Sequence, residues 1–191
     1  MTYAAYITAK KPRTEVMGMA GILDTARYRA FLAEALDVSP RDIQALLMGG
    51  RGDTMVPLPR YTTVSGIPVT ELIDTEKLNA IVERTKSGGG ELVQLMGTSA
   101  WYAPGSAAAR MAEAITGNEK RVFPCCAKLE GEYGLENVFV GVPVILGKNG
   151  IERIIELHLT DEERSHLYAS AASVKEMMEV LDQIETKNRP G

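Results

Sequence analysis

The chain has 191 residues, of which 45% are hydrophobic and 24% are charged, and its formal net charge is −4. This is an ordinary globular composition, which argues against a disordered protein, and the length suits one domain with a sizeable core. Acids and bases are interleaved along the chain. The mild acidity therefore gives no electrostatic reason to expect nucleic acid or an anionic membrane as a partner.

The two cysteines, Cys125 and Cys126, are adjacent in the sequence. Neighbouring side chains on an extended strand point to opposite faces, and a disulfide between them would be strained. We therefore expect two reduced thiols and a cytoplasmic protein. The segment 1–13 lacks the basic start and apolar core of a secretory signal, and no apolar run is long enough to cross a bilayer.

The first half of the chain is predicted to contain short helices and strands separated by turns rich in glycine and proline. In chain order the predicted elements are a helix over residues 1–9, a short buried strand over 16–19, a helix over 24–36, a buried strand over 43–48, a glycine-rich loop over 49–53 and a strand over 60–64.

The second half is predicted to contain longer elements. These are a helix over 78–96 that is interrupted or bent at the glycines 88–90, a helix over 102–115, strands over 121–128, 138–146 and 151–157, and a hairpin turn at 148–150. A final helix should start at Thr160, with Glu163 completing a capping box. Its apolar stripe, with Met177 and Met178, is expected to face the core, and the tail 187–191 to be frayed.

Strands and helices thus come in blocks, without the regular alternation of a doubly wound nucleotide-binding domain. The sequence has neither a G-x-G-x-x-G motif after a strand nor a P-loop. We therefore do not expect this chain alone to bind a dinucleotide through its pyrophosphate.

Asp24 and Arg27 form the first candidate site, because a spacing of three places both on one face of a helix. The carboxylate could orient an imidazole while the guanidinium holds a substrate carboxylate through two parallel hydrogen bonds. By spacing alone, the commoner interpretation is an acid near a helix N-terminus in a weak surface ion pair.

The loop Gly49-Gly50-Arg51-Gly52-Asp53 is the second candidate site, because flanking glycines let the backbone carry a side chain into a cleft. A plain turn is the alternative. The tripeptide at 51–53 also matches an integrin-recognition motif, which arises often by chance and does not suit a cytoplasmic protein. His158 and His166 have poor spacing for a metal site, so we expect surface or packing roles.

Three stretches resemble the lactate/malate dehydrogenase family. They are GMAGILDTARYR at 18–29, MGGRGDTMVPLPRYTTVSGIPV at 48–69, and GTSAWYAPGSAA at 97–108 with the strand segments that follow. The resemblance covers residues 1–184 and is closest to bacterial malate dehydrogenases that are built like lactate dehydrogenases. It implies the α+β C-terminal domain of that family, with antiparallel strands packed against long helices and no Rossmann domain.

The resemblance also implies residue roles. Asp24 matches the aspartate that holds the catalytic histidine, and Arg27 matches the arginine that grips the substrate C1 carboxylate. Ala100 and Pro104 match positions near the substrate and the nicotinamide. Members of the family are homo-oligomers that interconvert malate and oxaloacetate with NAD, a step of the tricarboxylic acid cycle.

The sequence departs from the family in two ways. The family begins with a Rossmann domain, so residues 1–15 are expected to be a remnant of the joining helix, 16–186 the catalytic, substrate-binding domain and 187–191 a tail. The family also has histidine where this chain has Arg51.

An arginine at this position should abolish general base catalysis. Histidine exchanges a proton near neutral pH, whereas arginine keeps its proton and offers no acceptor. We therefore expect an inactive enzyme domain that by itself binds no NAD. Three explanations stay open: an enzyme fragment, a sequence error, and a non-catalytic subunit or interaction module that pairs with full-length homologues. A small carboxylate-binding protein that uses Arg27 and Arg51 is a further alternative.

Overall fold

The computed structural model describes residues 1–50 and 52–188, with the backbone alone for Ala20, Asp53 and residues 185–188. Arg51 and the end of the predicted tail, 189–191, lie outside the described residues. The elements are α1 (Thr2–Ala9), α2 (Ala20–Leu36), β1 (Ile43–Gln44), β2 (Leu47–Gly49), η1 (Gly52–Thr54), β3 (Met55–Pro57), η2 (Pro59–Tyr61), β4 (Thr63–Val64), β5 (Ile67–Pro68), α3 (Val69–Leu72), α4 (Thr75–Met96), α5 (Tyr102–Thr116), β6 (Arg121–Glu130), η3 (Glu132–Gly134), β7 (Glu136–Gly147), β8 (Gly150–Ile154) and α6 (Asp161–Asn188).

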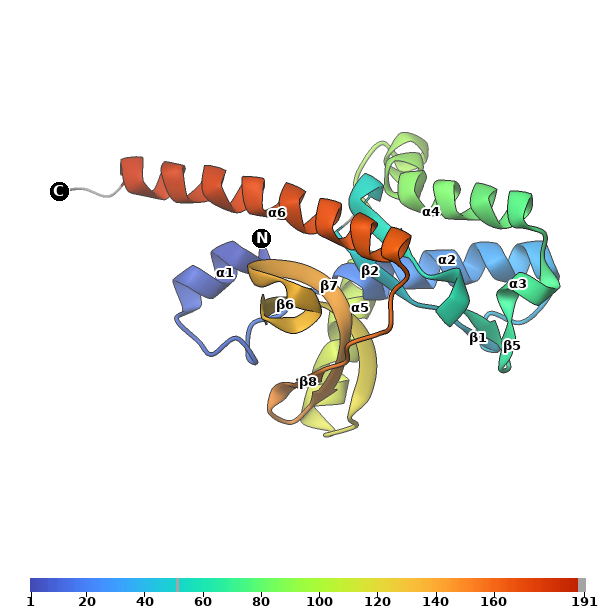
Figure 1. The fold of residues 1–191 in the computed structure, drawn as a ribbon, viewed down its shortest axis with the longest axis horizontal. Helices are drawn as coiled ribbons and strands as arrows, with labels where there is room; N and C mark the ends of the chain where they lie inside the picture. Colours follow the sequence, from blue (N-terminus) through green and yellow to red (C-terminus); the bar gives the residue numbers. More distant parts are fainter. Residues whose placement is uncertain (51, 189–191) are drawn as a thin grey trace.

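The centre of the fold is a five-stranded sheet in the order β3-β2-β7-β6, with β8 also paired to β7 (Figure 1). Every strand pair in it is antiparallel. A smaller sheet has the order β1-β4-β5 and is also antiparallel. This arrangement is the predicted α+β fold. Nearly all of β7 is buried, which explains why its sequence is a continuous run of valines and other apolar residues.

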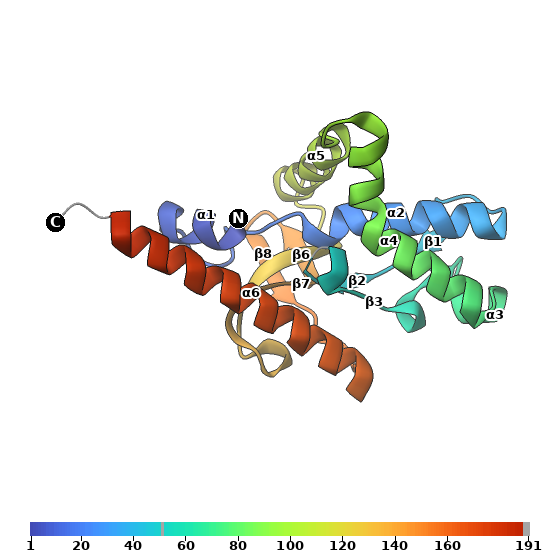
Figure 2. The same ribbon diagram turned by 90° about the horizontal axis from the view of Figure 1, so that it is seen from above.

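Helices pack against the sheets, and the core consists of two clusters of buried residues. Apolar residues of β6 and β7 pack against α5 and α6 in the larger cluster. In the smaller cluster, α2 packs against α4 and the small sheet, with Tyr28 and Leu32 fully buried. Figures 1 and 2 show α2 and α4 side by side and α6 running across the sheet toward α1.

The ends of the long helices follow the sequence signals. Thr160 and Glu163 form the predicted capping box at the start of α6, because the Thr160 N–H donates to Glu163 Oε2 at 2.8 Å and the Glu163 N–H donates to Thr160 Oγ1 at 3.2 Å. Gly97 ends α4 in the left-handed conformation, with φ +68°. Helix α4 passes through the glycines 88–90 without interruption.

Several predicted elements were wrong in extent. The strand predicted over 16–19 is a single bridge between Gly18 and Cys126. The strand predicted over 43–48 is two strands in different sheets, β1 and β2. The strand predicted over 60–64 shrinks to β4, because η2 occupies its first half. Met177 does not face the core, since 64% of it is exposed, whereas Met178 packs against the larger cluster.

Among the described residues, no helix is both long and apolar enough to cross a lipid bilayer. Both cysteines are free thiols, as predicted, and lie in β6. Burial raises the pKa of the Cys125 thiol to about 12, so this side chain behaves as part of the core rather than as a nucleophile.

Candidate active site

Helix α2 carries the first candidate pair and is anchored tightly to the central sheet. It begins at Ala20, so Asp24 and Arg27 lie one turn further into the helix than the sequence predicted. A Cβ atom added at Gly21 would lie 2.7 Å from Pro124 Cβ and 3.0 Å from the Leu47 carbonyl oxygen. Only glycine allows this close approach, which brings the following turn of α2 deep into the molecule.

Asp24 and Arg27 form an ion pair between a buried carboxylate and a partly buried guanidinium. Arg27 Nη1 lies 3.1 Å from Asp24 Oδ1, and the two side chains are 14% and 3% exposed, Arg27 first. The same nitrogen donates to the backbone carbonyl of Thr85 on α4, at 3.4 Å. The alternative of a weak surface pair was therefore wrong. A partly buried guanidinium with a fixed carboxylate beside it is a suitable partner for a second carboxylate, that of a ligand.

The glycine-rich loop between β2 and β3 is held at both ends. Gly49 and Gly52 have φ values of +80° and +63°, which favour glycine. The Gly50 N–H donates to Ser170 Oγ on α6, at 2.7 Å, and to the Thr54 carbonyl oxygen, at 3.1 Å. The start of the loop, Gly50, is thus joined both to α6 and to Thr54 at the other end of the loop.

One stretch of α4 contacts both candidate sites, the Asp24–Arg27 pair and the glycine-rich loop. Arg27 contacts the carbonyl of Thr85, and a Cβ atom at Gly52 would lie 4.0 Å from the carbonyl oxygen of the next residue, Lys86. The ion pair and the glycine-rich loop therefore meet consecutive residues of the same helix. Beside this meeting point, a groove of about 660 Å³ is lined by both polar and apolar residues, among them Thr54, Lys86 and Val82, but not by Asp24 or Arg27.

The remaining predicted site residues lie elsewhere. Ala100 is in the connection between α4 and α5, and Pro104 is in the first turn of α5; both are half-buried. Their side chains have no polar atoms, so their roles depend on the family resemblance. His158 and His166 are exposed, as predicted. Within the described part of the chain, no group of three or more His, Cys, Asp and Glu residues is placed to hold a metal ion.

Among the described residues, a turn that could hold the pyrophosphate of a dinucleotide would lie where a helix follows a strand. Among them, two α-helices follow strands, α3 and α6. The segments that lead into them, 67–68 and 155–160, contain no glycine. A pyrophosphate is held by the backbone of a glycine-rich turn at the start of a helix, and neither segment offers one.

Sequence reasoning missed three residues that fix the candidate site: Ser170, Thr85 and Gly88. Each acts across a long stretch of chain, so no local motif could reveal it. The three glycines at 88–90 did give a signal, but we interpreted them as a possible interruption of the helix rather than as a contact with Arg27.

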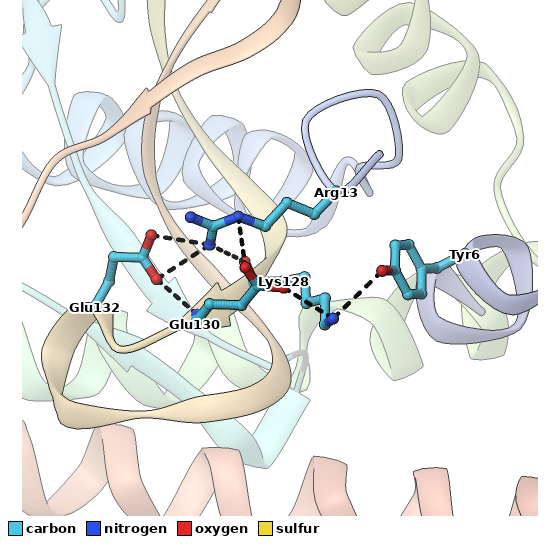
Figure 3. Close-up of polar contacts among 5 residues, drawn as sticks. All are labelled: Tyr6, Arg13, Lys128, Glu130 and Glu132. Atoms are coloured by element: carbon cyan, nitrogen blue, oxygen red, sulfur yellow. Dashed lines mark hydrogen bonds and ion pairs between the residues drawn. The ribbon is translucent and has the colours of Figure 1, made fainter. Parts of the chain in front are cut away.

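A second charged cluster, drawn in Figure 3, joins the N-terminal segment to the sheet. Arg13 lies 2.9 Å from Glu132 Oε1 and 3.3 Å from Glu130 Oε2. Lys128 lies 2.9 Å from Glu130 Oε1 and donates to the Tyr6 hydroxyl at 3.3 Å. The hydrogen bond from Lys128 lowers the pKa of Glu130. Since Arg13 and Lys128 each face a carboxylate and Lys128 also bonds Tyr6 of α1, the cluster joins the N-terminal segment to β6 and to the turn that follows it.

Comparison with known proteins gives the family. Residues 22–185 match the model of the lactate/malate dehydrogenase, alpha/beta C-terminal domain. The chain belongs to the lactate/malate dehydrogenase family. It is 65% identical over 182 residues to a malate dehydrogenase of Cytophaga hutchinsonii. The aligned region covers 95% of this chain and 58% of the relative.

Solved structures of the family have the same fold. The malate dehydrogenase of Salinibacter ruber superposes with a TM-score of 0.96 at 57% identity, covering 98% of this chain and 62% of that one. The lactate dehydrogenase of Eimeria maxima, solved with NADH and oxamate, gives 0.93 at 41% identity, covering 100% and 60%. The chain therefore spans about three fifths of the length of these family members.

Proposed function

We propose that this chain is the substrate-binding domain of a malate dehydrogenase, and that Arg27 binds one carboxylate of malate or oxaloacetate. The observation that carries the proposal is the Asp24–Arg27 pair, which meets the glycine-rich loop at one stretch of α4. The malate dehydrogenase names of the similar proteins support it. The domain limits expected from the sequence, with 16–186 as the substrate-binding unit, are part of the proposal.

Arg27 would bind the substrate carboxylate through a two-pronged contact, for which a guanidinium is better suited than an ammonium. Asp24 keeps the guanidinium in place and would orient the group at position 51. In the family that group is a histidine, which takes the proton of the C2 hydroxyl as malate is oxidised. Arg51 cannot accept a proton, so we propose that the chain as written lacks this step.

The hydride acceptor is NAD in the family, and it would be held by another part of the protein. Ala100 and Pro104 would border the substrate and the nicotinamide. We further propose that the working assembly is a cytoplasmic homo-oligomer of the tricarboxylic acid cycle. With NAD bound elsewhere, this chain would have to supply a site for the substrate carboxylate and a group that accepts the substrate proton.

Titration of the chain with L-malate, followed by NMR, tests the role of Arg27. We expect Arg27→Lys to weaken malate binding by about tenfold, because lysine cannot make the two-pronged contact. Arg29→Lys is the matched control: it makes the same change two residues away on α2, where Arg29 donates to the Pro40 carbonyl instead. Equal loss in both variants, or no malate binding by the chain, contradicts the proposal.

The alternative function is a non-catalytic subunit that pairs with full-length homologues. One expectation and one observation favour it: the family resemblance implies that Arg51 stands at the histidine position, and large apolar side chains are exposed around the α4–α5 connection, among them Leu95, Trp101 and Tyr102. Sedimentation of the chain mixed with the Salinibacter ruber enzyme tests this function. A mixed complex supports it, and separate sedimentation of the two proteins contradicts it.

A further inference from the structure

Gly88 lies so close to the Arg27 side chain that any larger residue at position 88 would force one of its neighbours to shift. A Cβ atom added at Gly88 would lie 2.5 Å from Arg27 Cδ, 2.9 Å from Nε and 3.5 Å from Cζ. The first two distances are far below van der Waals contact, so any side chain at this position must displace either the helix or the arginine. Gly88 is buried, and Arg27 lies directly against its backbone.

Helix α4 is not free to move away from α2. Leu78 and Thr85 of α4 are buried in the contact, and Arg84 stacks over the Phe31 ring at 4.1 Å while it pairs with Glu34. Moving the helix would disrupt all of these contacts. The arginine side chain has several rotatable bonds and can move at a smaller cost.

The neighbouring glycines show that this position is special. Gly89 and Gly90 follow Gly88 on the same helix, and an added Cβ atom at either would meet nothing within 4 Å. Glycine inside a helix lowers stability relative to alanine. At position 88, however, the absence of a side chain also leaves the space that the Cδ and Nε atoms of Arg27 fill.

We propose that Gly88 is a positioning residue for Arg27: its lack of a side chain keeps the guanidinium against Asp24 and the Thr85 carbonyl, in the place from which it binds the substrate carboxylate. The last part of this inference rests on the proposed function. The geometric part does not, since it concerns two residues of this chain and the space between them.

The experiment compares Gly88→Ala with Gly89→Ala in the 191-residue chain. The NMR signal of the Arg27 Nε–Hε group reports the position of the guanidinium. We expect this signal to shift in Gly88→Ala and to stay unchanged in Gly89→Ala. We also expect Gly88→Ala to weaken L-malate binding by about tenfold or more, since a small displacement of a two-pronged contact has a large effect.

Thermal unfolding in an Arg27→Ala background keeps the inference testable should Gly88→Ala fold poorly. In the Arg27→Ala background, Gly88→Ala should raise the melting temperature as much as Gly89→Ala does. With Arg27 present, Gly88→Ala should raise the melting temperature less than Gly89→Ala does, or should lower it. An unchanged Nε–Hε signal in Gly88→Ala, or the same difference in melting temperature in both backgrounds, overturns the inference. A shifted signal without any malate binding upholds the positioning of Arg27 and contradicts the proposed function.

Discussion

Ser170 accepts a hydrogen bond from the backbone N–H of Gly50, at 2.7 Å. This bond joins α6, near the end of the chain, to the glycine-rich loop 120 residues earlier. Ser170 is 2% exposed, so water cannot readily take over its role. The last helix therefore fixes the loop that carries position 51, in addition to covering the sheet.

Replacing Ser170 by alanine should destabilise the chain by about 1 kcal/mol, because one buried hydrogen bond is lost. The better helix propensity of alanine offsets part of this loss. Urea unfolding measures the difference. Ser165→Ala is the control, since Ser165 is an exposed residue of the same helix. A loss no larger than that of the control would mean that the Gly50–Ser170 bond contributes nothing to stability.

Gly141→Ala should be among the most destabilising substitutions in the sheet. Gly141 pairs with Gly49, and an added Cβ atom would lie 2.4 Å from the Gly49 carbonyl oxygen. Neither backbone can yield without separating β2 from β7, so we expect a cost of about 3 kcal/mol. Denaturant unfolding checks this against Gly105→Ala in α5, where the new atom meets nothing within 4 Å. Equal stabilities of the two variants would contradict the close approach.

Glu163 should make the chain less stable in acid. Hydrogen bonds from Arg60 lower the pKa of this carboxyl, against the opposing effect of burial, with a further contribution from the Thr160 N–H. The folded pKa is thus below the unfolded value of about 4.3. The stabilisation is full above the unfolded pKa and is lost as the pH falls through the lower, folded pKa.

Glu163→Gln tests this dependence, because glutamine can still complete the capping box but cannot ionise. Wild type should be the more stable protein at pH 7, and its advantage should shrink as the pH falls below about 4.3. Urea midpoints measured across this range report the difference. The control is Glu162→Gln, an exposed neighbour. The same pH profile for both variants would rule out a special role for Glu163.

Local signals predicted the elements that local physics determines. The capping box of α6 depends on residues three apart, and the β7–β8 hairpin depends on the turn at 148–150. The division of residues 43–49 between two sheets could not be predicted in this way. It depends on distant partners, because Ile43 pairs with Val64 whereas Gly49 pairs with Gly141.

For the candidate site, too, local sequence signals predicted only part of the structure. A spacing of three residues predicted that Asp24 and Arg27 share a face, but their burial depends on α4, which follows them by about 50 residues in the sequence. The Thr85 carbonyl and the missing side chain of Gly88 become visible only when the two helices pack. The sequence therefore indicated which residues form the candidate site, whereas the packing of α4 decides how they are held.

The last prediction concerns Arg51. We propose to join this chain to the N-terminal part of the Salinibacter ruber malate dehydrogenase, which is 58% identical over 191 residues. The fusion as written should reduce oxaloacetate very slowly, because arginine at position 51 cannot exchange the substrate proton. Arg51→His should raise the rate by about 10²–10⁴-fold, the range that general acid–base catalysis contributes. NADH absorbance measures both rates under matched conditions.

Arg51→Gln is the control, since it removes the fixed charge without supplying a group that can exchange a proton. If the histidine restores proton transfer, its rate should depend on pH near neutrality, whereas the glutamine variant should stay slow at every pH. Asp24→Asn in the histidine background should then lower the rate again, because Asp24 would no longer orient the imidazole. Equal rates for arginine, glutamine and histidine would show that position 51 is not the catalytic position, and the roles assigned to Asp24 and to the glycine-rich loop would fall with it.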